Sequence, residues 1–332
     1  MRVVFSILVL ITIFWGCQSK DVQSDFQENY YNIIIPQGFD SIPFPEEKPT
    51  FTQIELGRKL FFDKSLSLDK SISCANCHKP KYAFADTIKF SLGVNDSVGF
   101  RNAPTLTNVV YNSIYLMDGG VPTLETQAVI PIEDHLEMNI PIVELVKRLS
   151  ESVEYSKLSR EAFGREIDPY VITRALAAFQ RTLISGDSKY DKFVNGDRKI
   201  FSEKEKKGFK LFTSLNCIEC HSGFNFSNYT FQNNGLIALG DTGRARVTLK
   251  KEDVGKFKVP TLRNVGLTAP YMHDGRMSNI QEVIEHYNVG GDSSRNKSDL
   301  IQPLGLTVEQ KENLILFLHT LTDSNFVHKI YN

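Results

Sequence analysis

The sequence lacks several features that would point to common classes of protein. Lysine and arginine number 38 against 39 acidic residues, so the net charge of −1 gives no indication of a nucleic-acid partner. No stretch alternates apolar and polar residues convincingly as a half-buried strand does, which argues against a β-sheet fold. The chain has one tryptophan, Trp15, and only five cysteines. What remains is a helical sequence of 332 residues, which is long enough for two domains.

Long apolar character is confined to the N-terminus. Residues 3–14 form an apolar run of the length of an export signal, too short for a membrane span. Cys17 follows closely, as the lipid-bearing cysteine of a bacterial lipobox does, although Trp15 departs from the small residue usual there. We expect residues 1–17 to direct export to the periplasm with a lipid anchor at Cys17, and residues 18–50, with four prolines, to act as a tether. A plain signal peptide with an incidental cysteine is the alternative.

The other four cysteines belong to two copies of one motif. The copies are Cys74-Ala75-Asn76-Cys77-His78 and Cys217-Ile218-Glu219-Cys220-His221, and their spacing is that of a c-type haem attachment site. In such a site the two thiols add to the vinyl groups of one porphyrin, and the histidine binds the iron. A zinc site or a thioredoxin-like redox pair is the alternative, but zinc would leave both histidines unused and no βαβ pattern surrounds either copy. The sequence therefore predicts two covalently bound haem c groups, with His78 and His221 as iron ligands.

Helical periodicity accounts for much of the remaining chain. Apolar residues recur with helical spacing in residues 51–61, 140–157, 170–184 and 307–321. Ser202-Glu203-Lys204-Glu205 is a capping box at the start of a helix that leads to the second motif. Ser185-Gly186-Asp187 ends the third helix, and we place a domain boundary there. The sequence predicts an all-α protein of two cytochrome c-like domains, residues 51–186 and 187–332, each with one haem.

A second repetition relates the two domains. Pro104-Thr105-Leu106-Thr107-Asn108-Val109 matches Pro260-Thr261-Leu262-Arg263-Asn264-Val265, and the same offset matches Asp118-Gly119 with Asp274-Gly275. Extending this register places Pro131 opposite Tyr287. Proline has no side-chain donor atom, whereas a tyrosine phenolate can bind iron. We expect an open coordination position at the first haem and Tyr287 as the distal ligand of the second, with a surface tyrosine as the alternative and His286, Met272 and His273 as rival ligands.

Several motifs are specific enough to indicate a family. They are Leu56-Gly57-Arg58-Lys59-Leu60-Phe61-Phe62-Asp63, residues 73–78, Arg101-Asn102-Ala103-Pro104-Thr105, residues 124–137 and residues 257–275. Together they resemble the bacterial dihaem cytochrome c peroxidases, over nearly all of the chain after Pro49. The resemblance implies that hydrogen peroxide is reduced to water at the first haem, with electrons that a small soluble c-type cytochrome delivers through the second.

The same resemblance implies roles for further residues. Glu137 would supply a proton to the leaving oxygen of peroxide, and Gln127 would orient peroxide or water by its amide; a surface helix-cap glutamate is the alternative for Glu137. The family also implies a calcium ion bound by oxygens of Asn102, Thr268 and Pro270, since hard oxygen ligands suit calcium. Asn102 and Thr268 could equally be turn-forming residues. A second copy of the chain, in a homodimer, is a further expected partner.

The chain departs from the best-known peroxidases of this family at three positions. Val94 stands where they carry a histidine that caps the resting first haem, so the inhibitory ligand is expected to be absent. Tyr287 replaces their methionine, as in MauG, a related dihaem enzyme, and an anionic oxygen ligand favours ferric iron. Met117 replaces a tryptophan between the haems. These departures keep two other functions open: MauG-like oxidation of a protein or organic substrate, and pure electron transfer, which fits poorly with Pro131.

Overall fold

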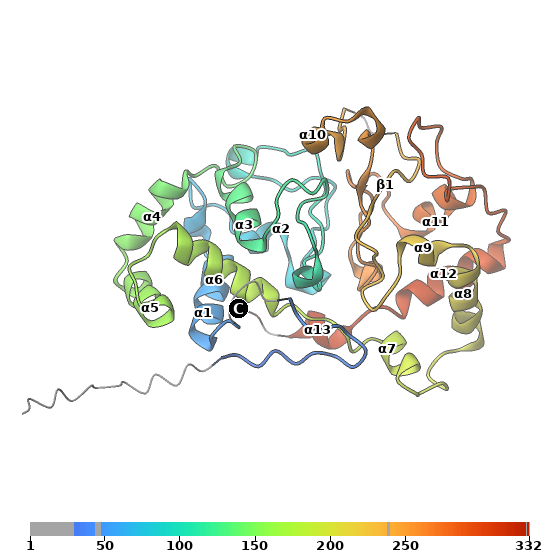
Figure 1. Ribbon diagram of the computed structural model, residues 1–332, viewed down its shortest axis with the longest axis horizontal. Helices are drawn as coiled ribbons and strands as arrows, with labels where there is room; N and C mark the ends of the chain where they lie inside the picture. The colour runs from blue at the N-terminus through green and yellow to red at the C-terminus, as the bar shows by residue number, and fades with distance from the viewer. Residues whose placement is uncertain (1–29, 44–47, 238–239, 330, 332) are drawn as a thin grey trace, which may run out of the picture.

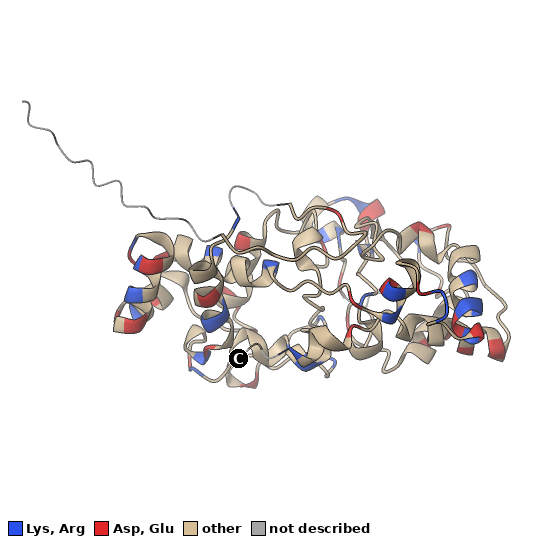
Figure 2. Cartoon of the chain, turned by 90° about the horizontal axis from the view of Figure 1, so that it is seen from below, with Lys and Arg blue, Asp and Glu red and all other residues tan. Residues whose placement is uncertain are grey.

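The computed structural model describes residues 30–43, 48–237, 240–329 and 331, which form two halves side by side (Figure 1). The predicted signal sequence, Cys17 and the first part of the predicted tether lie outside the described residues. Every helix in the described part of the chain is too short or too polar to cross a bilayer. Acidic and basic residues are interspersed along the outer helices of both halves (Figure 2), in line with the balanced charge of the sequence.

The first half is helical. Its α-helices are α1 (Phe51–Phe62), α2 (Cys74–Cys77), α3 (Leu124–Glu133), α4 (Ile142–Ser150), α5 (Val153–Phe163) and α6 (Pro169–Arg181). Short 3-10 turns lie between them: η1 (Lys64–Leu66), η2 (Pro80–Tyr82), η3 (Val94–Asp96) and η4 (Val109–Tyr111). The helix expected over residues 140–157 is in fact two helices. Ser152 begins the second one as its N-cap, because its side chain accepts a hydrogen bond from the backbone N–H of Tyr155.

The second half repeats this construction and adds a small sheet. Its α-helices are α7 (Lys189–Val194), α8 (Glu203–Ser214), α9 (Cys217–Cys220), α10 (Ala245–Thr248), α11 (Ile280–Asn288), α12 (Val308–His319) and α13 (Ser324–His328). Two 3-10 turns, η5 (Lys251–Asp253) and η6 (Val265–Leu267), and the antiparallel strands β1 (Phe231–Gln232) and β2 (Phe257–Lys258) complete it. The predicted capping box at Ser202 and Glu205 is confirmed at the start of α8. The all-α prediction is confirmed as well, because nearly all regular elements are helices. The two strands are two residues long each, so they leave no alternating pattern in the sequence.

Each half is built on one pair of crossed helices. Helix α1 packs on α6 in the first half, and α8 packs on α12 in the second. A glycine lies at each crossing: a Cβ added at Gly57 would lie 1.8 Å from the carbonyl oxygen of Ala175, and one at Gly208 would lie 1.9 Å from that of Asn313. Only a residue without a side chain permits such a close approach. The same device therefore sets the helix packing in both halves.

Two repeated asparagines join the halves at their junction. The Asn108 side chain donates to the carbonyl oxygen of Ser185 at 2.9 Å and to the side-chain oxygen of Asn225 at 3.1 Å. The Asn264 side chain donates to Thr107 Oγ1 at 3.2 Å and to Ser185 Oγ at 3.0 Å. Asn108 and Asn264 are matched positions of the sequence repeat, so equivalent loops of the two halves meet at the junction.

The C-terminal segment returns to the first half. Phe326 of α13 and Tyr331 belong to the hydrophobic core of the first half, and the ring of Tyr331 lies 4.9 Å from that of Phe84, centroid to centroid. Figure 1 shows α13 beneath the junction of the two halves. The boundary between residues 186 and 187 stays a prediction. The segment after residue 323 belongs to the predicted second domain by sequence, but it packs on the first half.

Candidate haem sites

The first Cys-x-x-Cys-His motif forms one turn of helix followed by a turned-back histidine. Cys74 packs against the core of the first half, and Ser73 holds the start of the turn through hydrogen bonds with Asn76. His78 Nδ1 lies 2.9 Å from the carbonyl oxygen of Phe84. A histidine whose Nδ1 is held by a carbonyl keeps Nε2 available, which is the usual arrangement of a metal-binding histidine.

The second motif has the same geometry. Cys217 packs against the core of the second half, and His221 Nδ1 lies 3.1 Å from the carbonyl oxygen of Phe226. Burial lowers the pKa of both His78 and His221, and nearby carbonyl oxygens oppose this shift. The neutral imidazole is the form that binds a metal. The chain therefore offers two equivalent sets of two thiols and one neutral histidine, which fit covalent haem c.

The zinc alternative finds no support in the described part of the chain. Within it, no three or more His, Cys, Asp and Glu side chains are grouped closely enough to hold a metal ion. The four thiols of the two motifs lie in separate halves, on α2 and α9 (Figure 1). They cannot form the pooled four-thiolate site that zinc would favour.

Glu137 lies beside the first motif because the chain folds back after α3. The backbone N–H of Met138 donates to the carbonyl oxygen of Pro131 at 3.0 Å, and that of Glu137 donates to Asp134 at 3.0 Å. Burial raises the pKa of the Cys74 thiol to about 12, and Cys77 and the Glu137 carboxylate add to the rise. Glu137 is thus close enough to both thiols of the motif to influence them electrostatically.

The Glu137 carboxyl group has an unusual pKa. Protein atoms surround it closely enough for burial to raise the pKa to about 7, and repulsion from Asp134 acts in the same direction. Its side chain nevertheless keeps an exposed surface. A carboxyl group that titrates near neutrality can both give and take a proton.

Gln127 and Pro131 lie one helical turn apart on α3, so they share a face of that helix. Pro131 lies inside the helix and has no N–H, so it cannot donate the usual bond to the Gln127 carbonyl oxygen. Gln127 is half-buried. This face of α3 carries an amide side chain and a proline ring, and neither competes strongly for iron.

Val94 is held against the Glu137 segment. Its backbone N–H donates to the Glu137 carbonyl oxygen at 2.9 Å, and Ser97 Oγ donates to that of Leu136 at 3.0 Å. A Cβ added at Gly93 would lie 2.1 Å from the Leu136 carbonyl oxygen, so the two backbones are in close contact. Val94 is buried and has no atom that binds a metal.

Tyr287 occupies the corresponding region of the second half. It lies on α11, which Asn279 caps, and its hydroxyl oxygen is 3.3 Å from Asn234 Nδ2. Burial raises the pKa of Tyr287, the bond from Asn234 opposes the rise, and the thiols of Cys217 and Cys220 add to it. The hydroxyl group is therefore within electrostatic range of the second motif, as Glu137 is of the first.

The rival ligands in this region have other contacts. His286 Nε2 lies 3.0 Å from the carbonyl oxygen of Asn234. The ring of His273 stacks on Phe257, with centroids 4.0 Å apart and an angle of 14° between the planes. Met272 Sδ lies 3.4 Å from Asn234 Nδ2, close to Tyr287. The Met272 sulfur therefore contacts the same Asn234 side-chain amide as the Tyr287 hydroxyl group.

Comparison with known proteins agrees with this geometry. The sequence profile of the family described as "Di-haem cytochrome c peroxidase" matches residues 52–199. The methylamine utilization protein MauG of Methylorubrum extorquens is 36% identical over 294 residues, which cover 85% of this chain and 82% of that protein. The cytochrome c551 peroxidase of Pseudomonas aeruginosa is 33% identical over 281 residues, covering 81% of this chain and 78% of that one.

This chain belongs to the di-haem cytochrome c peroxidase family. A solved structure supports the assignment: a MauG-like protein associated with microbial copper homeostasis superposes with a TM-score of 0.86 at 30% identity, covering 91% of this chain and 98% of that one. The chain is therefore an oxidoreductase, and its family implies two c-type haems. The resemblance noted in the sequence is confirmed.

Two of the three residues expected to bind calcium donate hydrogen bonds through their side chains. Asn102 Nδ2 donates to the carbonyl oxygens of Ile88 and Lys89, at 3.0 and 3.2 Å. Thr268 Oγ1 donates to the carbonyl oxygen of Val265 at 3.4 Å. These contacts fit the alternative in which both residues form turns, and the calcium site stays a prediction.

The contact region between the halves of this di-haem protein contains Lys258, a residue of one of the family motifs to which the sequence assigned no role. Lys258 donates its backbone N–H to the carbonyl oxygen of Met117 at 2.8 Å and its Nζ to that of Ile114 at 2.7 Å. Burial lowers the pKa of Lys258 to about 8, and Asp118 opposes the shift. Lys258 lies two residues before Pro260, and the carbonyl oxygen of Pro260 approaches His221. A short run of the backbone therefore connects Met117 with the second haem site.

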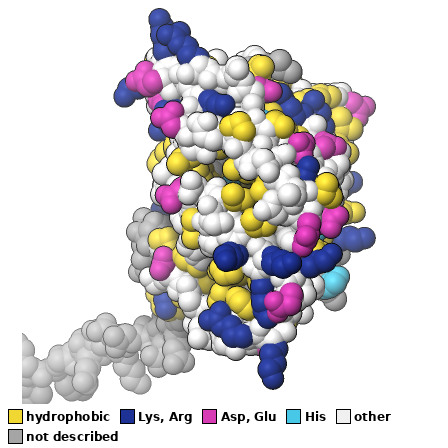
Figure 3. Space-filling model, turned by 90° about the vertical axis from the view of Figure 1, so that its right-hand side faces the viewer, with side chains coloured by type: hydrophobic (Ala, Val, Ile, Leu, Met, Phe, Trp, Pro, Cys, Tyr) yellow, Lys and Arg dark blue, Asp and Glu magenta, His cyan; other side chains and the backbone are white. Residues whose placement is uncertain are grey.

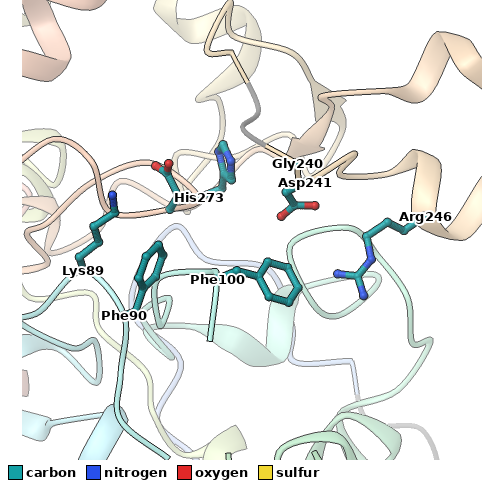
Figure 4. Close-up of a pocket in the computed structure, with 8 residues that line it drawn as sticks. Lys89, Phe90, Phe100, Gly240, Asp241, Arg246 and His273 are labelled. Carbon is teal, nitrogen blue, oxygen red and sulfur yellow. The ribbon is translucent and has the colours of Figure 1, made fainter. Parts of the chain in front are cut away.

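A cavity of about 510 Å³ lies at the same junction. Figure 4 shows Lys89, Phe90 and Phe100 from the first half opposite Asp241, Arg246 and His273 from the second. At its edge Arg101 joins the halves, with bonds of 2.7 and 3.0 Å to the Asp241 carboxylate and one of 2.8 Å to Asp118. Arg101 belongs to one of the family motifs, but its partner Asp241 lies 140 residues away and no periodic pattern marks it.

Proposed function

We propose that this protein reduces hydrogen peroxide to water at the first haem, with electrons from a small c-type cytochrome that enter through the second. One observation carries the proposal. Matched positions of the repeat hold Pro131, which cannot bind iron, and Tyr287, which can, while the carboxyl group of Glu137 lies beside the first motif only. One reactive and one closed centre would follow from this difference.

The chain's own residues would have distinct roles in this reaction. The haems, when bound, supply the redox chemistry. Glu137 would hold a proton and deliver it to the leaving oxygen, which its pKa of about 7 favours at neutral pH. Gln127 would orient peroxide or water with its amide, and Pro131 would keep the site free of a competing ligand. Val94 in place of a capping histidine would leave the site open without prior activation.

Spectroscopy and turnover of the purified holoprotein test this proposal together. Electron spin resonance of the oxidised protein should show one high-spin and one low-spin haem, and reduced c-type cytochrome should be oxidised on addition of peroxide. Two low-spin, six-coordinate haems would contradict the open site and favour the pure electron carrier. A high-spin first haem without cytochrome oxidation would contradict the peroxidase.

A second candidate function is oxidation of a protein or an organic molecule, as in the MauG branch of the family. Tyr287 and Val94 favour it, and the relatives above include MauG and a MauG-like protein. Peroxide would then oxidise the haems without cytochrome turnover, and the oxidised state would decay faster when the true substrate is added. A decay rate unaffected by any protein or organic molecule from the same compartment would contradict this candidate.

The place of action and the donor's docking face are also proposals. We propose export to the periplasm and a lipid anchor at Cys17. A Cys17→Ser variant should move from the membrane fraction to the soluble fraction with its haems intact, and a distribution identical to the unmodified protein would argue against the anchor. Figure 3 shows apolar side chains scattered over the outer end of the second half, with basic and acidic side chains among them. Such a mixed face suits a transient complex with a small cytochrome.

Two further properties follow from the family resemblance. A calcium ion at Asn102, Thr268 and Pro270 should raise the melting temperature when added to chelator-treated protein, and no change would argue against it. A homodimer should give twice the mass of one chain in light scattering at micromolar concentration, and the mass of one chain would argue against it.

A further inference from the structure

The Asn234 side chain lies between two possible ligands of the second haem. Its Nδ2 is 3.3 Å from the hydroxyl oxygen of Tyr287 and 3.4 Å from the sulfur of Met272. The thioether sulfur only accepts hydrogen bonds, so the amide must present its NH2 group to this side. If the amide were flipped, its oxygen would face the Met272 sulfur, and both atoms are acceptors. The orientation of Asn234 therefore makes the Tyr287 oxygen an acceptor.

The structure holds Asn234 in this position from several directions. Its backbone carbonyl oxygen lies 3.0 Å from His286 Nε2. His286 is buried, and its ring is nearly perpendicular to that of Tyr287, with centroids 5.4 Å apart. The preceding Asn233 is buried, accepts from the backbone N–H of Gly235 at 2.9 Å and donates to Ser294 Oγ at 2.9 Å. An amide whose backbone is fixed on both sides loses little entropy when it donates. Asn234 is thus preorganised toward Tyr287.

The first half has no equivalent arrangement at the matching position. Pro131 stands there in place of Tyr287, and it offers no side-chain oxygen to a donor. A hydrogen bond that depends on the Tyr287 oxygen would act on only one of the two haems. It could therefore help to make the two haems unequal.

We propose that Asn234 is a positioning residue whose amide donates a hydrogen bond to the Tyr287 oxygen and tunes the second haem through it. This inference rests on the proposed ligation of that haem by Tyr287. Donation to an anionic oxygen ligand withdraws charge from it and weakens its preference for ferric iron. Loss of the amide donor should therefore lower the reduction potential of the second haem.

The test uses the holoprotein with two substitutions, Asn234→Leu and Asn234→Asp. Both remove the NH2 donor at nearly the same volume, and both leave the backbone carbonyl for His286. We expect each to shift the ferric-to-ferrous equilibrium of the second haem about tenfold toward ferric, which is about 59 mV for one electron. Spectroelectrochemical titration measures the shift, with haem content and circular dichroism as checks on folding. A shift in the leucine variant alone would indicate a packing role and overturn the inference.

Two control variants separate the possible failures. Met272→Leu removes the sulfur and keeps the volume, so the low-spin spectrum of the second haem should persist if Tyr287, and not Met272, is its ligand. Tyr287→Phe should change the low-spin spectrum of the second haem. If it does not, the proposed ligation is wrong. If it does, and neither Asn234 variant moves the potential, the ligation stands and the role of Asn234 is wrong.

Discussion

The two halves of the protein are alike where they hold a haem and differ where a second ligand would approach it. In the first half Gly57 permits α1 to cross α6, and His78 Nδ1 is held by a carbonyl oxygen. In the second half Gly208 and His221 have the same contacts with α12 and with Phe226. The halves differ in other residues: the first contains Pro131 and Glu137, and the second contains Tyr287 and Asn234. A duplicated scaffold can thus support two functions through a few residues that do not build it.

The largest effect on this comparison should come from Glu137. Replacing it by glutamine keeps the shape and removes the ionisable proton, so peroxide turnover should fall by roughly 10²–10⁴-fold. Steady-state kcat/KM with peroxide and reduced cytochrome measures the loss. Glu144→Gln, at an exposed position of α4, is the matched control and should behave like the unmodified protein. Equal activities of the two variants would argue against the acid role.

Pro131→His would make the first half resemble the second. If the histidine occupies the iron in about 99% of molecules, the reactive form falls to one in a hundred and activity drops about a hundredfold. The first haem should then become low-spin and six-coordinate. Pro131→Ala adds no donor atom and should leave the first haem high-spin. A high-spin first haem in the histidine variant would mean that Pro131 does not face the iron.

The shared scaffold can be broken in either half by one methyl group. Gly57→Ala and Gly208→Ala should each lower the free energy of unfolding by roughly 1–3 kcal/mol, because the new Cβ would overlap a carbonyl oxygen of the partner helix. Thermal unfolding followed at the haem absorbance measures the effect. Gly99→Ala is the control, since a Cβ there meets nothing within 4 Å. A loss in only one half would show that the two crossings are not equivalent.

The pH dependence of activity should also separate the halves. The pKa of Glu137 is about 7, so the acid form predominates below that pH and is lost above it. Turnover limited by proton delivery should fall about tenfold for each pH unit above 7 and level off below it. The same limb should be absent from the residual activity of Glu137→Gln. A limb that persists in this variant would belong to another group.

Several features of the fold can be predicted from the sequence because their signals are local. The two Cys-x-x-Cys-His motifs, the capping box at Ser202 and the helical class follow from spacing and periodicity, which act over a few residues. The break between α4 and α5 does not follow from periodicity, although its signal, the N-cap Ser152, is local too. The apolar pattern continues across the break, and periodicity alone does not reveal a cap.

By itself the sequence determined the two haem motifs, the repeat and the contrast between Pro131 and Tyr287, because these depend on residue type and register. Only the tertiary structure decided that Glu137 lies beside the first motif, that α13 packs on the first half and that Asn234 meets Tyr287. Asn234 lies in a loop 53 residues before its partner, where no periodic pattern marks either contact. Loops of this kind are placed by the packing of the helices around them, and that packing is a property of the whole chain.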